Sequence, residues 1–485
     1  MKLILQLLLA ALLAFTMSAA PAGKPNIIFI FTDDQAVDTI AATKMWGVDA
    51  SVIQTPNMDR LAGEGTRFTH AYNMGAWAGA VCVSSRSMLQ TGRFLWHSYN
   101  AEENHYTGLL ESGSFWSQRM KSAGYETYMS GKWHVQAKVE NLFDHVSHVR
   151  LGMPPITKTA YGRPIEGKQD SWLPWDESNG GYWSGGKHWS EVLADDAETF
   201  IGKAAGKGKP FFMYLAFNAP HDPRQSPKSF VDMYPLEKIP LPENFQPLNP
   251  HHQAMGLGPA DMKALRDEAL APFPRTEFAV KTHRREYDAL ITHLDVQIGR
   301  ILDALDHAKV SENTYVIFTS DHGLALGRHG LMGKQNMYEH SLRVPFIIRG
   351  PGIPKGVVRD ARIYMQDAMA TSLDLAGADM KGLEFKSVMP MVRDADKSQY
   401  ESVYGAFGMK EQRAVIDGDH KMILYPATGT ILLFDLSKDP LEMNDLAGKP
   451  ESATLEKRLF ARLRELQRQT GDQLDLTRSY PKLAE

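Results

Sequence analysis

The chain has 485 residues, 43% of them hydrophobic and 23% charged, with a formal net charge of −4. This composition is typical of a globular protein with room for two or three domains, and it excludes a disordered or fibrous chain. The small negative charge gives no indication of nucleic acid or of an anionic membrane surface as a partner.

Residues 1–22 predict a secretory signal peptide. Lys2 provides the charged start, the apolar run 3–15 follows, and Ala20 and Ala22 offer a cleavage site of small residues. The run is shorter than the roughly 20 apolar residues of a membrane-spanning helix, and no later segment suits one. We therefore expect an exported protein, periplasmic or secreted, with no stable membrane anchor.

Four short apolar runs predict strands that are buried on both faces, as in a parallel sheet. They are residues 26–31, 125–130, 211–218 and 315–320. Helical patterns lie between them at 55–65, 114–124 and 285–308, the last with an apolar stripe of Leu290, Leu294, Ile298 and Leu302. Strands that alternate with helices predict an α/β domain.

Each of these strands is followed at once by side chains suited to catalysis. Ligands bind at the carboxyl ends of the strands in open α/β sheets, so these side chains could converge. They are Asp33, Asp34, Lys132, His134, His221, Asp321 and His322. Each alone has an ordinary structural explanation, such as a turn for the Asp pair, but their shared position favours one site.

The residue types in this set favour hydrolysis of a charged sulfate or phosphate ester with a metal ion. The three carboxylates favour Ca²⁺ or Mg²⁺, and the imidazole of His322 leaves room for Mn²⁺ or Zn²⁺. Positive charge is available from Arg86, Lys132 and Lys334. His134 and His221 can transfer protons near neutral pH.

The only cysteine, Cys82, stands at the start of a predicted helix, VCVSSRSMLQTGR at residues 81–93. A lone cysteine in an exported chain is buried, paired with another chain, or reactive. Because a helix N-terminus favours an anion, a reactive group here would face an anionic substrate with the helix dipole behind it.

Residues 82–86, CVSSR, followed by Thr91, Gly92 and Arg93, resemble the signature of type I, formylglycine-dependent sulfatases of the alkaline phosphatase-like superfamily. Further motifs match in the family's order: TDDQ at 32–35, GKWH at 131–134, APHDP at 219–223 and SDHG at 320–323. The resemblance covers about residues 25–485. It implies a large, mostly parallel sheet sandwiched by helices in a catalytic domain, 25–395, and a smaller C-terminal subdomain, 400–485.

The resemblance implies that a maturation enzyme oxidises Cys82 to formylglycine, whose hydrate attacks the sulfur atom of a sulfate ester. The metal, expected to be Ca²⁺ ahead of Mg²⁺ or Mn²⁺, would be held by the residue at position 82 and by Asp33, Asp34, Asp321 and His322.

The resemblance also implies roles for the basic residues. Lys132, Lys334 and His221 would bind the substrate, and Arg86 would hold the formylglycine. His221, with Lys334, would protonate the leaving oxygen, and His134 would remove a proton from the second hydroxyl of the hydrate. Ser84 stands where the common signature has Pro or Ala, which leaves open the maturation system that accepts it.

The segment 137–190 is rich in aromatic rings, among them Trp172, Trp175, Trp183, His188 and Trp189. Such rings suit sugars, but they could equally pack a long irregular insertion. The Pro-rich segment 222–284 could also line the pocket. Because an exported sulfatase commonly meets sulfated glycans, we expect a carbohydrate sulfate, with choline sulfate and aryl sulfates as alternatives.

The C-terminal region predicts a small antiparallel sheet with a helix. Residues 412–435 alternate like paired strands around the turn ATGT. The expected helix, 451–470, has Leu455, Leu459, Leu463 and Leu466 on one face.

Three other functions stay open from sequence alone. A phosphodiesterase or phosphonate monoester hydrolase of the same superfamily would share this fold. A non-catalytic binder of sulfated glycans would keep Cys82 unconverted. A thiol-dependent hydrolase is disfavoured, because metal-binding carboxylates beside a thiolate nucleophile would be an unusual combination.

Overall fold

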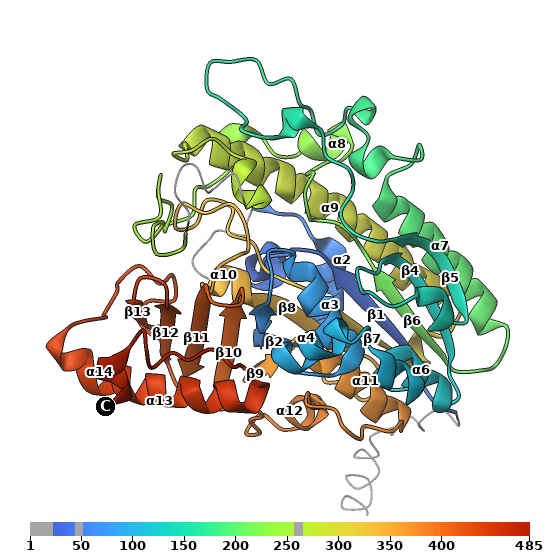
Figure 1. Cartoon of the computed structure of the whole chain (residues 1–485). Coiled ribbons are helices and arrows are strands. Elements are labelled where there is room, and N and C mark those ends of the chain that lie inside the picture. The colour runs from blue at the N-terminus through green and yellow to red at the C-terminus, as the bar shows by residue number, and fades with distance from the viewer. Residues whose placement is uncertain (1–22, 44–51, 257–264) are drawn as a thin grey trace, which may run out of the picture.

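The computed structural model describes residues 23–43, 52–256 and 265–485 (Figure 1). The predicted signal peptide, 1–22, lies outside the described residues. Within the described part, none of the helices has the length and apolar character needed to span a membrane.

An eight-stranded sheet forms the centre of the molecule, in the order β5-β4-β6-β1-β7-β8-β2-β9. Only β8 runs antiparallel to its neighbours, which confirms the predicted mostly parallel sheet. The strands are β1 (Asn26–Thr32), β2 (Thr66–Tyr72), β4 (Glu126–Lys132), β5 (His145–Arg150), β6 (Phe211–Ala216), β7 (Thr314–Ser320), β8 (Arg343–Arg349) and β9 (Val357–Tyr364).

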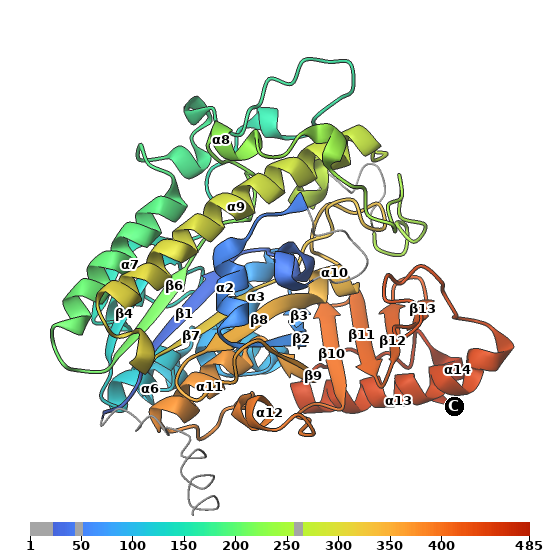
Figure 2. The ribbon, with the colours of Figure 1, turned by 180° about the vertical axis from the view of Figure 1, so that it is seen from behind.

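Helices cover both faces of this sheet (Figures 1 and 2). Ile28 and Ile30 of β1 pack against α2 (Pro56–Gly63), α7 (Trp189–Ala205) and α9 (Glu277–His307). Alternate β1 residues, such as Phe29, pack on the opposite face with α3 (Val81–Thr91), α6 (Trp116–Ser122) and α11 (Asp367–Ala376). Burial on both sides explains why β1 is apolar throughout rather than at every second residue.

The long helix α9 begins at Glu277, well before the predicted start near residue 285. Thr276 caps it, because its hydroxyl accepts a hydrogen bond from the N–H of Ala279 at 3.1 Å. The predicted stripe is fully buried, as Leu290, Leu294, Ile298 and Leu302.

A five-stranded sheet, β13-β12-β11-β10-β3, forms the second unit, and α13 (Ala453–Thr470) packs against it. Its strands are β3 (Gly75–Ala76), β10 (Ser402–Phe407), β11 (Gln412–Asp417), β12 (His420–Tyr425) and β13 (Thr430–Asp435). Strand β3 comes from the N-terminal half and pairs in parallel with β10. Gly75 permits this approach, since a Cβ there would lie 1.9 Å from the carbonyl O of Ala406.

The remaining helices are short and connect these layers. They are α4 (Leu95–Glu103), α5 (Thr107–Glu111), α8 (Lys228–Val231), α10 (Glu339–Leu342), α12 (Met389–Arg393) and α14 (Pro481–Ala484).

Candidate active site

The four strands expected from sequence lie side by side in the large sheet, in the order β4-β6-β1-β7. They are parallel, so their carboxyl ends meet at one edge. The polar residues at the ends of these strands gather there, namely Asp33, Asp34, Lys132, His134, His221, Asp321 and His322.

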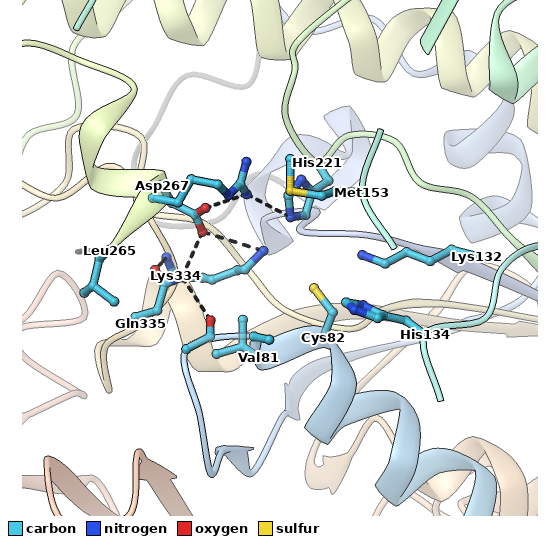
Figure 3. Close-up of a pocket in the computed structure, with 13 residues that line it drawn as sticks. Val81, Cys82, Lys132, His134, Met153, His221, Leu265, Asp267, Lys334 and Gln335 are labelled. Carbon is cyan, nitrogen blue, oxygen red and sulfur yellow. Dashed lines mark hydrogen bonds and ion pairs between the residues drawn. The ribbon is translucent and has the colours of Figure 1, made fainter. Parts of the chain in front are cut away.

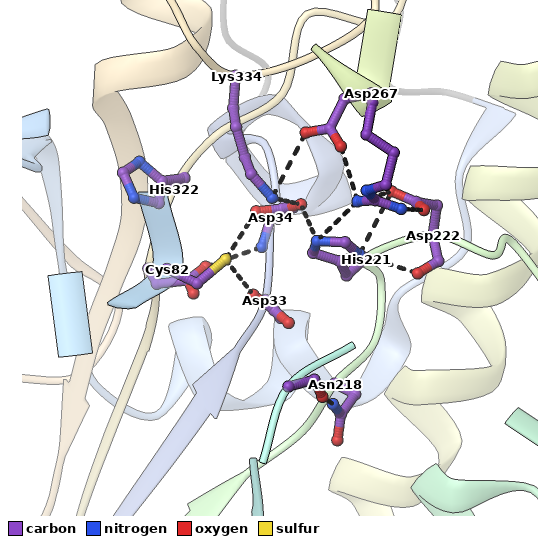
Figure 4. Close-up of polar contacts among 12 residues, drawn as sticks. Asp33, Asp34, Cys82, Asn218, His221, Asp222, Asp267, His322 and Lys334 are labelled. Carbon is purple, nitrogen blue, oxygen red and sulfur yellow. Dashed lines mark hydrogen bonds and ion pairs between the residues drawn. The ribbon is translucent and has the colours of Figure 1, made fainter. Parts of the chain in front are cut away.

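Asp33, Asp34, Cys82 and Asp321 form a compact group whose candidate ligand atoms all lie within 4.8 Å of one another. The thiol of Cys82 donates a hydrogen bond to Oδ1 of Asp33 at 3.2 Å, and Figure 4 shows this contact. The N–H of Asp34 donates to Oδ1 of Asp321 at 2.9 Å. Asp34 has a φ of 66°, a left-handed conformation that Asp tolerates better than most residues other than glycine.

Three cations balance the three carboxylates of this group. The pairs are Lys132–Asp33, Lys334–Asp34 and Arg86–Asp321, the last at 3.2 Å. All of these side chains are buried. The six charges sum to zero, so a bound divalent cation would leave an excess of positive charge that favours an anionic substrate.

The buried charges set the ionisation of the group. Burial raises the pKa of the Cys82 thiol well above its ordinary value, and the nearby carboxylates add to this effect. Burial likewise raises the pKa of Asp34, against the opposing effect of Lys334. Burial also opposes ionisation of Asp321, but the Arg86 guanidinium, Lys132 and a hydrogen bond with Asp33 together outweigh it and hold the pKa of that carboxyl well below its usual range. A free thiolate at Cys82 is therefore disfavoured, which argues against thiol-dependent hydrolysis.

The residues present fit a hard divalent cation. Three carboxylates offer oxygen ligands of the kind that Ca²⁺ and Mg²⁺ prefer. His322 lies beside the group of four but outside it. Its Nε2 atom is buried and has no hydrogen-bond partner among the described residues, so it remains available as a ligand atom.

A pocket of about 260 Å³ opens over this group (Figure 3). Helix α3 begins at Val81 on its wall, and no side chain of Ala80 caps the helix. The free N–H groups of this first turn favour an anion. The lining includes five residues expected from sequence, Cys82, Lys132, His134, His221 and Lys334.

The two histidines that line the pocket are neutral. Nδ1 of His221 donates to the carbonyl O of Asp222 at 2.8 Å, which leaves Nε2 facing Asp34 at 3.4 Å. Burial lowers the pKa of His221 well below its ordinary value, and neighbouring cations add to the effect. Burial, followed by Lys132, lowers the pKa of His134 to about 3. Both rings are therefore present as bases near neutral pH.

Several residues of the pocket wall were not named one by one from the sequence, namely Met153, Leu265, Arg266, Asp267 and Gln335. Three of them, Leu265, Arg266 and Asp267, lie in the Pro-rich segment 222–284, which the sequence analysis considered as a possible part of the wall. Arg266 joins the wall to the histidine motif, since its guanidinium pairs with Asp222. No motif or periodicity marks the individual residues.

Of the two alternatives left open for the aromatic rings of segment 137–190, packing and sugar contact, the structure favours packing. Trp172 is 2% exposed, and the guanidinium of Arg163 stacks on its ring at 4.6 Å. His188 stacks on Tyr182 at 4.9 Å. None of the rings named from sequence is among the described residues that line the pocket.

Comparison with known families matches residues 25–378 to the model named Sulfatase. A second model, N-sulphoglucosamine sulphohydrolase, C-terminal, matches residues 327–469. The chain is 28% identical to an N-acetylglucosamine-6-O-sulfatase of Bacteroides thetaiotaomicron, covering 93% of this chain and 87% of the relative. It is also 28% identical to an arylsulfatase of Clostridium perfringens, covering 88% and 91%.

Solved structures share the fold. One is a complex with its substrate D-glucosamine-2-N,6-O-disulfate, with a TM-score of 0.69, 24% identity and coverage of 93% of this chain and 99% of that one. Another is a phosphonate monoester hydrolase from Silicibacter pomeroyi, with a TM-score of 0.71, 20% identity and coverage of 93% and 96%. The family match confirms the resemblance read from the motifs: the chain belongs to the sulfatase family of sulfuric ester hydrolases.

Proposed function

We propose that this protein is an exported sulfatase that hydrolyses a sulfate ester of a carbohydrate, with formylglycine made from Cys82 as its nucleophile. The observation that carries the proposal is the position of Cys82. Its sulfur lies at the pocket wall, in one group with the carboxylates of Asp33, Asp34 and Asp321. Lys132 lines the same pocket.

We further propose Ca²⁺ as the metal, held by Asp33, Asp34, Asp321, His322 and the converted residue 82. When bound, the cation and the formylglycine supply a polarising charge on the sulfate oxygens and a nucleophile with two hydroxyl groups. The neutral sum of the six buried side-chain charges supports this assignment, because the added positive charge would then be available to the substrate.

The basic residues of the pocket have separate roles in substrate binding and proton transfer. Lys132 and Lys334 bind sulfate oxygens as compact positive charges. Arg86 fixes this arrangement, since its Nη1 donates to the carbonyl O of Lys132 at 3.0 Å. The ammonium of Lys334 carries the proton for the leaving oxygen, and His221 relays it through Nε2, which is unprotonated at rest because the ring is neutral and Nδ1 donates to a backbone carbonyl. His134 accepts a proton from the nucleophile side, and its Nδ1 has no hydrogen-bond partner among the described residues.

A carbohydrate substrate is supported by the relatives and by the size of the pocket. One similar protein is named N-acetylglucosamine-6-O-sulfatase and another, from Formosa agariphila, ulvan-active sulfatase. A pocket of about 260 Å³ lies slightly below the range usual for drug-sized ligands. It therefore suits a single sulfated sugar ring better than a long oligosaccharide.

The test combines peptide mass spectrometry with sulfate release. Protein from the native host should carry an aldehyde or its hydrate in the peptide spanning residues 81–86. It should release sulfate from sulfated monosaccharides faster than phosphate from the phosphate ester of the same alcohol. The Cys82→Ala variant is the matched control for both assays. An intact thiol with no sulfate released from any ester would contradict the proposal and favour a glycan-binding protein.

Export is tested on the same material. The mature protein should begin after Ala22, and cell fractionation should place it outside the cytoplasm. An intact N-terminus on active protein would contradict this part of the proposal alone.

A further inference from the structure

The wall of the pocket opposite Cys82 is built by a short 3-10 helix, η9 (Arg266–Ala269), which comes from the long Pro-rich segment. Asp267 of this helix is 3% exposed. Its Oδ1 atom accepts a hydrogen bond from Nη2 of Arg266 at 2.7 Å. Its Oδ2 atom accepts from Nε2 of Gln335 at 2.9 Å and lies 3.7 Å from Nζ of Lys334.

The carboxylate of Asp267 therefore contacts Lys334 directly and is linked to His221 through Arg266. Lys334 is shared between Asp34 on one side and Asp267 on the other. Arg266 extends the contact to the histidine, since its Nη2 atom lies 3.4 Å from Nε2 of His221. Figure 4 shows Asp267, Lys334 and His221 in this arrangement.

The placement of Asp267 is fixed by its neighbour in the chain. The carboxylate of Glu268 accepts hydrogen bonds from the N–H groups of Met332 and Gly333, at 2.9 and 2.8 Å. The absence of a side chain at Gly333 allows this approach, because a Cβ there would lie 2.9 Å from Cβ of Asp267. The backbone just before Lys334 is thus held directly against η9.

We propose that Asp267 is a positioning residue that holds Lys334 on the substrate side of the site. Without it, Asp34 would be the one carboxylate among the described residues that still pairs with the Lys334 ammonium. The ammonium would then move toward the metal group and away from the sulfate. Asp267 is ionised for this role, because Lys334 and Arg266 together outweigh the effect of burial and keep its pKa below the ordinary value.

This inference rests on the proposed function, since it takes Lys334 to bind a sulfate oxygen. The Asp267→Asn variant should therefore raise KM for a sulfate ester by about tenfold, the effect of one charge-assisted hydrogen bond. We expect kcat to change by less than about threefold. Asp267→Glu should recover part of the loss. The control is Glu277→Gln, which removes a negative charge from an exposed position at the start of α9. It should leave KM and kcat unchanged.

Binding of inorganic sulfate, measured by calorimetry on the full-length mature protein, tests the inference without turnover. The Asp267→Asn change should weaken sulfate binding in the wild-type background but have no further effect in a Lys334→Met background. Equal losses in both backgrounds would overturn the inference, as would a variant that loses only thermal stability. Absence of sulfate binding in the wild type would also overturn it. Failure of the proposed function would show separately, as wild-type protein that binds sulfate but releases none from any ester.

Discussion

The sulfur of Cys82 lies 3.2 Å from Oδ1 of Asp33, although the two residues are 49 positions apart in the chain. One stands in the first turn of α3 and the other directly after β1. The contact places the group that we propose to be modified against the carboxylates that we propose to bind the metal. The proposed nucleophile and the proposed metal site are therefore in direct contact, and a substitution in either should affect both.

Replacement of Cys82 by Ser tests the nucleophile. Serine fills the same space, but as an unoxidised side chain it provides one hydroxyl and no aldehyde hydrate. We expect kcat/KM for a sulfated sugar to fall at least about 10³-fold, with the melting temperature nearly unchanged.

The matched control for this variant is Ser84→Ala in the same helix. Alanine is common at this position of the signature, and the change removes only the acceptor for the N–H of Trp77 at 3.3 Å. It should cost about 1 kcal/mol of stability and keep activity. An active Cys82→Ser protein in which mass spectrometry finds an unoxidised serine at position 82 would show that turnover needs neither the thiol nor its aldehyde.

Removal of the metal should lower both activity and stability. Asp33, Asp34 and Asp321 converge in the folded protein, so a cation that they bind stabilises the folded state over the unfolded chain. Adding Ca²⁺ at about 100 times its Kd to chelated protein should add about 2.7 kcal/mol to the free energy of unfolding.

The Asp321→Asn variant lacks one proposed metal ligand, so added Ca²⁺ should raise its free energy of unfolding much less. Thermal unfolding with and without the ion measures both proteins. Full activity in protein shown by elemental analysis to be metal-free would contradict the metal assignment.

A buried charge cluster between the two sheets predicts how stability depends on pH. Nζ of Lys421 lies 2.7 Å from Oε1 of Glu442 and 3.0 Å from Oε1 of Glu339. Burial raises the pKa of Glu442 from 4.5 to about 7, with Lys421 opposing and Glu339 adding to the shift. Between these two pH values the folded protein binds more protons than the unfolded chain. The contribution of Glu442 is therefore complete below pH 4.5 and is lost as the pH rises through 7.

The measurement is urea unfolding of wild type and Glu442→Gln at pH 5 and pH 8. Relative to wild type, the variant should gain on the order of 2 kcal/mol of unfolding free energy between pH 5 and pH 8. The same substitution at the exposed Glu451 is the control. A difference that does not change with pH would show that Glu442 ionises normally in the folded protein.

The sequence was sufficient to predict the four adjacent strands β4, β6, β1 and β7 of the large sheet and the edge where the candidate site residues gather. A strand buried on both faces is apolar throughout, as β1 is, and a parallel arrangement forces the residues after each strand to one edge. This reasoning places Asp33 and Asp321 together from the sequence alone. It could not place the imidazole of His322, which lies beside the group of four rather than inside it.

Contacts between backbone segments that are far apart in the chain could not be predicted from the sequence. Strand β3 has only two residues, and its pairing with β10 joins Gly75 to Ala406. The position of Asp267 depends on the bonds that Glu268 makes to the backbone of Met332 and Gly333. Neither feature leaves a periodic pattern, because each is fixed by the tertiary structure and not by local propensity.

The aromatic insertion, whose role the sequence left undecided, yields the last prediction. Trp172 packs under the guanidinium of Arg163, which itself pairs with Glu286 of α9 at 2.5 Å. The ring therefore links the insertion to the long helix. Trp172→Ala should lower the free energy of unfolding by about 3–5 kcal/mol, as expected for a buried ring. The KM of the folded enzyme for a sulfated monosaccharide should stay within about twofold. Denaturant unfolding and steady-state kinetics on the same preparation separate the two effects. A higher KM at unchanged stability would instead make Trp172 part of the sugar site.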